Sequence, residues 1–422
     1  MIYRLLHPCN GSVAIDFAAG QLVMLAANFN ALDSHCARAS TDVSRLIEMS
    51  KTPEIALIIS TYQRPRHLQR ALLSVAVQKN VAGKMEVVVC DDGSADETKE
   101  VVETFARSVD FSVRFVTHPH VTFQLSRCRN EGARVSTAPY LLFLDGDCLL
   151  PPDHVAIQLA RRRPKVTRAG TFIRLDQAAS ERIDEQAIRS GKFVRWAPAD
   201  EIRKMRNKGR RSIVYEWLRH PTKPRLVGNN IAVWRSDYER INGFDENFEG
   251  WGWEDDDFGV RLRRAGVRLR SILAWTVIYH MWHPTHETIP ATGEIGKNEK
   301  YLNRPGALVR CRNGFVKRQL SDLRWRVVGA PPAGMPSWIR PHNSASAINS
   351  GAPEVEILVT PGPGKFTGQA DCNILVSLDQ SPTDARLARQ AHMIVTDGEL
   401  PSGEAHSVFR LHQLEDALKA VA

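Results

Sequence analysis

The sequence predicts an α/β protein built on a doubly wound, mostly parallel β-sheet. Between residues 54 and 148, short apolar runs alternate with segments whose apolar residues recur at helical spacing, in the order β-α-β-α-β-α-β. The apolar runs are continuous, as in strands covered on both faces. Right-handed crossovers between such strands give a parallel sheet with helices on both sides. No GxGxxG pattern follows the first strand, which argues against the dinucleotide-binding fold of dehydrogenases.

The first two strand–helix pairs have clear boundaries. Residues 55–59 are β-branched or aliphatic, and the predicted helix after them begins at Pro65, whose fixed φ suits a first helical turn. Residues 85–90 form the second predicted strand, which ends at the sequence DDGS. Ser94 and Glu97 have the spacing of a capping box, so we expect them to start the next helix.

The next elements lead to a pair of carboxylates. We expect a strand over residues 111–116, a helix over 125–135, and a strand from residue 140 that ends in Asp145-Gly146-Asp147. Ligands bind outside the carboxyl ends of the strands in open α/β sheets. Two carboxylates this close repel each other unless a cation or hydrogen-bond donors neutralise them, so a divalent metal carrying phosphate fits the pattern. The alternative is a solvated turn.

The residues after 150 are less regular. Helical patches are expected near residues 181–189 and 199–208, and a strand over residues 226–234. Four consecutive acids at residues 254–257 lead into a predicted helix that ends near Gly266. One long strand is then expected from residue 267 to 279, followed by two histidines.

These patterns divide the chain into four parts. Residues 1–50 are an N-terminal extension whose short apolar segments fit either strands or a helix. Residues 51–325 are the main domain, in two parts, 51–150 and 151–325. A linker rich in Pro, Gly, Ser and Ala follows over residues 326–353, and residues 354–422 form a small acidic α/β module. In this module we expect strands over 355–360, 373–378 and 393–396, and helices over 383–390 and 411–421.

Composition and charge exclude several classes of protein. The chain has 422 residues and seven cysteines without a CxxC pair, which argues against a disulfide framework and a zinc site. Residues 161–235 contain 20 Lys/Arg and 7 Asp/Glu, an excess of 13 positive charges. This basic region could face nucleic acid, an anionic membrane surface or a phosphorylated substrate, or could simply be solvated.

Nucleic acid is the weakest of these partners, because no nucleic-acid-binding motif accompanies the charge. No apolar stretch reaches the roughly 18 to 20 residues of a membrane span, and no signal-peptide pattern is present. We therefore expect a cytoplasmic protein, with peripheral contact to the inner membrane surface left open.

Five segments in this order carry a family resemblance. They are STYQR (60–64), DDGS (91–94), SRCRNEGA (126–133), LFLDGDC (142–148) and GFDENFEGWGWEDDDFGVRLRRAG (243–266). Over roughly residues 53–284 the chain resembles a GT-A fold glycosyltransferase of the family 2 type, with a galactosyltransferase-like C-terminal acidic motif. LFLDGDC corresponds to the DxD motif of that family.

The resemblance implies a nucleotide-binding half over residues 51–150 and an acceptor half over residues 151–325. It also implies a UDP-sugar site and a metal site. The residues implied in nucleotide-sugar binding are Thr61, Arg64, Asp91, Asp92, Arg129, Asp145, Gly228, Asn229 and Trp251. Among them, Asp92 would accept from the base, Arg129 would approach the base or the phosphates, and Asp145 would contact ribose and metal-bound water. Asp147 would bind the metal together with His280 or His283, and this ligand set suits Mn²⁺, with Mg²⁺ possible.

The resemblance also implies a catalytic base and a reaction. Asp255 is the expected base, with Glu254 as the alternative or as an acceptor ligand, whereas acids in a first helical turn also have a structural role, credible for Asp256 and Asp257. The expected reaction is inverting transfer of a hexose or N-acetylhexosamine to a glycan, which could be anionic or lipid-diphosphate-linked. A non-catalytic nucleotide-sugar-binding module and a retaining transferase are the alternatives.

Overall fold

The computed structural model describes residues 52–284, 296–330, 335–336, 339, 352–361, 364–378, 384–399 and 407–421, together with the backbone of three strands near the N-terminus. The chain divides into two compact units, Met1–Lys51 and Thr52–Ala422. In the first unit, β1 (Tyr3–Leu6), β2 (Ser12–Ala18) and β3 (Gln21–Met24) form an antiparallel sheet. The sequence pattern of residues 1–50 fitted either strands or a helix, and the segments that the structure describes are strands.

The second unit is built on a seven-stranded sheet in the order β12-β9-β11-β7-β4-β5-β6. Its strands are β4 (Ile55–Thr61), β5 (Met85–Asp91), β6 (Val113–Thr117), β7 (Tyr140–Asp145), β9 (Val166–Ala169), β11 (Asn230–Trp234) and β12 (Arg268–Ser271). β4 pairs in parallel with β5 and β7, whereas β11 runs antiparallel to β7 and β9. The predicted mostly parallel α/β sheet is confirmed.

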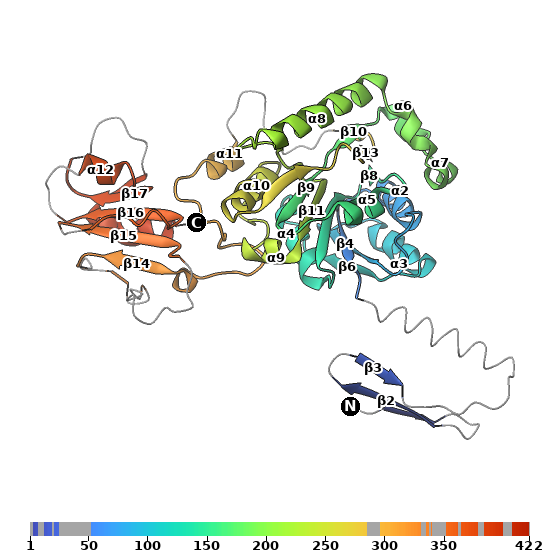
Figure 1. Ribbon diagram of the computed structural model, residues 1–422, viewed down its shortest axis with the longest axis horizontal. Coiled ribbons are helices and arrows are strands. Elements are labelled where there is room, and N and C mark those ends of the chain that lie inside the picture. Colours follow the sequence, from blue (N-terminus) through green and yellow to red (C-terminus); the bar gives the residue numbers. More distant parts are fainter. Residues whose placement is uncertain are drawn as a thin grey trace. The chain divides into compact units, whose positions relative to one another are not determined.

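Helices cover both faces of this sheet (Figure 1). α2 (Pro65–Ala76), α3 (Thr98–Ser108) and α5 (His154–Arg161) pack in one apolar core, and α4 (Leu125–Val135), α9 (Arg235–Arg240) and α10 (Glu254–Arg264) pack in the other. Side chains alternate along β4, so that Leu57 enters the first core and Ile58 the second. Strand β4 is therefore buried on both faces, as its continuous apolar run indicates.

A second, three-stranded sheet carries one of the predicted histidines. β8 (Cys148–Leu149) and β10 (Phe172–Arg174) flank β13 (Ile278–His280). The single strand expected over residues 267–279 is wrong, because β12 and β13 belong to different sheets. Between them the chain turns at Ile272, whose carbonyl accepts from the backbone N–H groups of Trp275 and Thr276 at 2.9 and 3.2 Å.

The helical patches also differ from the prediction. Residues 177–196 form α6 (Gln177–Glu181), α7 (Glu185–Ser190) and a 3₁₀ helix, η1 (Lys192–Trp196). The predicted patch over 181–189 is broken because Asp184 caps α7, accepting from the backbone of Ala187 at 2.7 Å. The predicted helix over 199–208 continues much further, as α8 (Ala199–Trp217). Among the described residues, no helix combines the length and apolar character that a membrane span needs.

The C-terminal module is a parallel sheet in the order β14-β15-β16-β17-β18. Its strands are β14 (Trp325–Val328), β15 (Val355–Thr360), β16 (Cys372–Ser377), β17 (Met393–Thr396) and β18 (Ser407–Phe409), and its helices are α12 (Ala385–Ala388) and α13 (Leu414–Lys419). β14 takes up residues assigned to the linker, and β18 was not predicted. Much of the remaining linker lies outside the described residues.

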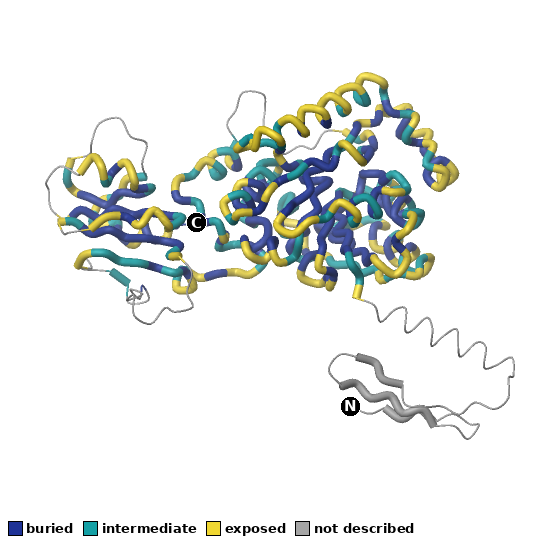
Figure 2. The backbone as a smooth tube through the Cα atoms, in the orientation of Figure 1, coloured by how far each residue is buried: buried dark blue, intermediate teal, exposed yellow. Residues whose placement is uncertain are grey.

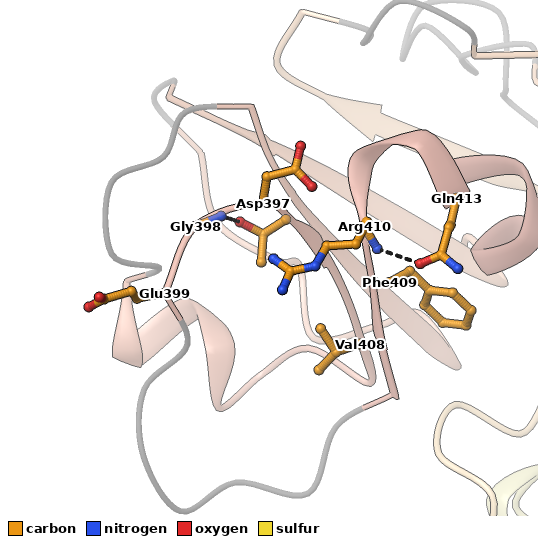
Figure 3. Close-up of a pocket in the computed structure, with 8 residues that line it drawn as sticks. Asp397, Gly398, Glu399, Val408, Phe409, Arg410 and Gln413 are labelled. Atoms are coloured by element: carbon orange, nitrogen blue, oxygen red, sulfur yellow. Dashed lines mark hydrogen bonds between the residues drawn. The ribbon is translucent and has the colours of Figure 1, made fainter.

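A hollow of about 800 Å³ lies at the carboxyl ends of β17 and β18 (Figure 3). Asp397, Glu399 and Arg410 are among the side chains that line it. Their charges are mixed and no motif accompanies them, so the hollow does not point to a particular ligand.

Candidate active site

The ends of three neighbouring strands meet at one edge of the main sheet. Thr61 at the end of β4 pairs with Asp91 of β5, and Ser60 pairs with Asp145 of β7. Behind Asp145, the N–H of Gly146 donates to the carbonyl of Ser60 at 2.8 Å. A Cβ on Gly146 would lie 3.1 Å from the Thr61 side chain, so glycine permits this close approach. The expected clustering of these strand ends is present.

Asp91 is held by hydrogen bonds from the loop that follows its own strand and from the end of β6. Its carboxylate accepts from the hydroxyl of Ser94 at 2.5 Å, the N–H of Ser94 at 2.9 Å and the hydroxyl of Thr117 at 2.8 Å. The capping box predicted for Ser94 and Glu97 is therefore wrong. Helix α3 begins at Thr98 without a side-chain cap, and Ser94 instead fixes the Asp91 carboxylate and accepts from the N–H of Gln63 at 2.8 Å.

Asp92 is oriented by a buried histidine that the sequence gave no reason to select. His118 Nε2 lies 2.8 Å from Asp92 Oδ1, and His118 Nδ1 lies 2.8 Å from Glu131 Oε2. Burial alone lowers the pKa of His118, but the hydrogen bonds with the two carboxylates outweigh it and raise the pKa to about 9. His118 is therefore an imidazolium at neutral pH, donating to both acids. Beside it, His120 stacks on Tyr62 with ring centroids 4.3 Å apart.

Arg129 lies buried between two acids. Its guanidinium is 3.2 Å from Glu254 Oε1 and 3.6 Å from Asp145 Oδ1. Desolvation and the Asp255 charge raise the pKa of Glu254 to about 7, against the opposing charge of Arg129. Desolvation likewise raises the pKa of Asp145 to about 7. The expected approach of Arg129 to the base or the phosphates stays a prediction. Arg129 links the DxD motif to the acidic block.

Three predicted metal ligands converge. One ligand atom each from Asp147, His280 and His283 lies within 4.8 Å of the others. β13 brings His280 beside β8, where it pairs with Cys148, and the N–H of Met281 donates to the carbonyl of Asp147 at 3.0 Å. Burial lowers the pKa of His280, which favours the neutral imidazole that a metal requires.

Arg64 places a positive charge in the same cluster. Its Nη1 lies 3.3 Å from Asp147 Oδ2 and 3.2 Å from His283 Nε2. Burial alone raises the pKa of Asp147, but the His283 hydrogen bond and the neighbouring charges of His280 and Arg64 hold it well below its usual range. Nε2 of His283 lies 3.2 Å from both Arg64 Nη1 and Asp147 Oδ2, so this nitrogen faces the cluster. Its Nδ1 lies 2.6 Å from the carbonyl of Pro284, which holds the ring in this orientation.

The four acids of the acidic block have different environments. Asp255 accepts only backbone N–H groups, from Gly228 at 3.0 Å and Asp256 at 2.8 Å. Asp256 pairs with Arg225 at 2.9 Å, and Asp257 is buried against Arg261 at 2.6 Å. Asp257 thus has a structural role, whereas Asp255 keeps no side-chain partner among the described residues.

The remaining predicted residues line the same region. A Cβ on Gly228 would lie 2.4 Å from Arg129 Nη2, so a larger side chain at this position would displace the guanidinium. The amide oxygen of Asn229 is buried and finds no hydrogen-bond donor among the described residues. Trp251 is half exposed, and Asn298 of α11 (Lys297–Leu302), which the sequence did not single out, donates to the backbone carbonyls of residues 249, 251 and 252.

Comparison with known families decides the assignment. The model described as "Glycosyl transferase family 2" matches residues 56–164. Residues 56–164 therefore resemble glycosyl transferase family 2. A second model, described as "N-terminal domain of galactosyltransferase", matches residues 210–286 of the chain. The two matches cover the DxD motif, the acidic block and both histidines, and the predicted GT-A family resemblance is confirmed.

Curated relatives share the same region. Validoxylamine A glucosyltransferase of Streptomyces hygroscopicus subsp. jinggangensis is 30% identical over 231 residues, covering 52% of this chain and 53% of the relative. Chondroitin synthase of Escherichia coli is 26% identical over 265 residues, covering 57% of this chain and 37% of the relative. The chain thus spans about half of the first relative's length and less of the second's.

Solved structures with a similar arrangement include a mannosyltransferase of Pyrobaculum calidifontis in complex with GDP-Man and Mn²⁺. It is 18% identical, covers 61% of this chain and 66% of that chain, and has a TM-score of 0.39. TarS of S. aureus in complex with UDP-GlcNAc is 13% identical, covers 59% and 64%, and has a TM-score of 0.40.

Proposed function

We propose that the chain is a metal-dependent, inverting glycosyltransferase that moves a hexose or N-acetylhexosamine from a UDP-sugar to a hydroxyl of a glycan or lipid-linked acceptor. The observation that carries the proposal is the convergence of Asp147, His280 and His283 within 4.8 Å. This cluster lies beside the strand ends that hold Thr61 and Asp91. The match of residues 56–164 to the family 2 model makes a nucleotide sugar the expected ligand of that edge.

The donor set fits Mn²⁺, with Mg²⁺ tolerated. One carboxylate and two imidazoles suit a first-row divalent metal, and the Nδ1 contact of His283 with a carbonyl leaves its Nε2 free to coordinate. When bound, such an ion supplies Lewis-acid stabilisation of the departing UDP. Arg64 pairs with Asp147 at 3.3 Å, and its charge would be available to the diphosphate if the guanidinium left the carboxylate.

The nucleoside side of the site rests on Asp91 and Asp92. Five hydrogen bonds, from Ser94, Thr117, His118 and the N–H of Gln124, hold the two carboxylates in place. A carboxylate accepts up to about four hydrogen bonds, so each retains capacity for an N–H of the base or a ribose hydroxyl. The Tyr62–His120 stack offers a flat surface nearby for the base.

Asp255 is the base that we propose for the acceptor hydroxyl. Glu254 pairs with Arg129, whereas Asp255 accepts only backbone N–H groups within the part of the chain that the structure describes. Burial and the charge of Asp256 raise the pKa of Asp255, which strengthens it as a base. A single base acting in one displacement inverts the anomeric carbon, so a UDP-α-sugar gives a β-linked product. An α-linkage by NMR would instead support a retaining enzyme.

A screen of UDP-sugars identifies the donor. Purified chain with Mn²⁺ is offered UDP-glucose, UDP-galactose, UDP-N-acetylglucosamine and UDP-N-acetylgalactosamine, and UDP release is measured with and without glycan acceptors. UDP-glucose is included because one relative is named a glucosyltransferase. Release that requires Mn²⁺, is lost in Asp147→Ala and persists in Asp110→Asn, an exposed carboxylate outside the site, supports the proposal. Tight UDP binding without any turnover would support a binding module instead.

The acceptor is proposed to be a glycan that is anionic or carried on a lipid diphosphate. The basic region over residues 161–235 and the name of the E. coli relative, a chondroitin synthase, support an anionic acceptor. Comparing transfer to neutral and anionic acceptors at low and high salt separates charge recognition from recognition of the sugar itself.

A further inference from the structure

Helix α8 presents an outward stripe that the proposed chemistry does not use. Arg203, Arg206, Arg210, Val214 and Trp217 follow each other at spacings of three or four residues, so they lie on one side of the helix. All five are exposed, and Figure 2 shows α8 exposed along much of its length. The stripe changes character along the helix, from cationic at its start to apolar at its end.

The first half of the stripe surrounds a hollow with positive charge. Arg203, Arg206 and Arg210 line a hollow of about 500 Å³ together with Ala199 and Ile202. Exposed Lys204, Lys208 and Arg211 lie on the same helix, and Arg219 directly follows it. Three guanidinium groups around an apolar floor suit a phosphate group attached to an apolar body.

The second half of the stripe is apolar although it faces solvent. Trp217 is 81% exposed, Leu218 60%, Ile213 57% and Val214 52%. Single exposed apolar residues are common in proteins, but four within six residues form a patch.

The opposite side of α8 anchors it to the domain. Gly209 and Ser212 are buried, and Glu216 accepts from the N–H of Ser271 at 2.6 Å and from Arg270 at 2.8 Å. The helix therefore belongs to the folded domain and turns its stripe outward as a fixed element. A partner can bind the stripe without unfolding any part of the domain.

We propose that this face of α8 docks on the surface of an anionic lipid bilayer. Cations alone would equally suit a nucleic acid or an acidic polysaccharide. The bases or sugar rings of those partners can stack on Trp217, but they offer no apolar phase that buries the aliphatic side chains of Ile213, Val214 and Leu218. Interfacial helices combine basic residues with Trp, Phe and Leu, whose apolar parts enter the boundary between headgroups and acyl chains. Both halves of the stripe have a counterpart only at such a surface. Docking does not depend on the proposed glycosyl transfer.

The test is co-sedimentation of the full chain with vesicles. Vesicles of phosphatidylcholine alone are compared with vesicles containing phosphatidylglycerol, in low and high salt. The charge variant is Arg203→Glu/Arg206→Glu/Arg210→Glu, and the apolar variant is Trp217→Ser/Leu218→Ser. The matched charge control replaces three exposed lysines on other elements, Lys79→Glu/Lys84→Glu/Lys99→Glu, and the apolar control is the half-exposed Val316→Ser.

The wild type is expected to bind only the anionic vesicles, more weakly in high salt. Each basic residue near such a surface contributes about fivefold in affinity, so the charge variant should bind at least about 100-fold more weakly, with its control near wild type. The apolar variant should also lose binding, although its charge is unchanged. A dye on Val214→Cys should shift to the blue with anionic vesicles, with dye-treated wild type as background, because the described cysteines are all buried.

Three results would overturn the proposal. The first is a wild type that binds neither kind of vesicle. The second is vesicle binding that persists in both α8 variants. The third is α8-dependent binding to heparin or RNA with none to vesicles, which would assign the surface to a soluble polyanion. Thermal unfolding that matches the wild type is required of each variant, so that loss of binding reports the surface and not the fold.

Discussion

Protonation of His118 should make the stability of the domain fall as the solution becomes alkaline. The imidazole is 3% exposed and lies 2.8 Å from both Asp92 and Glu131. Its pKa of about 9 in the folded chain exceeds its ordinary value of 6.5. The folded state therefore binds this proton more tightly than the unfolded state does. The resulting stabilisation is fully present below pH 6.5 and is lost as the pH rises through about 9.

The magnitude follows from the difference between the two pKa values. It corresponds to about 3 kcal/mol as an upper bound. His118→Gln removes the titrating group while keeping a side chain that can donate to one carboxylate. The wild type should be more stable than this variant at pH 6.5, and the difference should shrink by up to about 3 kcal/mol toward pH 10.

Urea unfolding of the full chain, followed by tryptophan fluorescence across this pH range, measures that difference. His154→Gln is the control, because burial lowers the pKa of His154 to about 3 and this histidine stays neutral throughout. Its difference from wild type should be constant with pH. A wild-type minus His118→Gln difference that does not change with pH would refute the protonated bridge.

Other predictions concern the acidic block and the core. Asp255→Asn should lose glycosyl transfer while keeping UDP–Mn²⁺ binding by calorimetry, and lost nucleotide binding would mean that Asp255 is structural. Arg261→Met should lower the free energy of unfolding by about 3–5 kcal/mol, because it leaves Asp257 buried without its partner, and a cost near zero contradicts this. Gly132→Ala should cost about 1–3 kcal/mol, since its Cβ would lie 2.4 Å from Cys90 Sγ, whereas Gly259→Ala, with contacts of 3.4 Å, should be neutral or stabilising. Equal thermal shifts for the two alanine variants would contradict this account.

The strands and the residues at their ends could be predicted from the sequence because those signals are local. Continuous apolar runs identified β4, β5 and β7, and the carboxyl ends of parallel strands necessarily meet at one edge. The antiparallel direction of β11 could not be predicted, because a continuous apolar run is compatible with a buried strand of either direction in the sheet. The division of residues 267–279 between two sheets depends on a turn at Ile272 that carries neither Gly nor Pro.

The partners inside the site could not be predicted, since they come from distant parts of the chain. His118 follows β6 outside any motif, and its role appears only when α4 brings Glu131 against it. Arg129 and Glu254 are 125 positions apart, so the buried pair that joins the two halves of the site is a product of the fold. The capping box predicted at Ser94 was wrong because a serine three residues before a glutamate can either cap a helix or, as here, donate to a neighbouring carboxylate.

The central claim is that Asp147, His280 and His283 hold one divalent ion for a nucleotide sugar. The most direct measurement is electron paramagnetic resonance titration of Mn²⁺ into the full chain with UDP present. We expect one bound Mn²⁺ per chain in the wild type and in Asp256→Asn, and loss of that ion in Asp147→Ala and in the double variant His280→Ala/His283→Ala. Full Mn²⁺ binding in Asp147→Ala, with the nucleotide still present, would contradict the account.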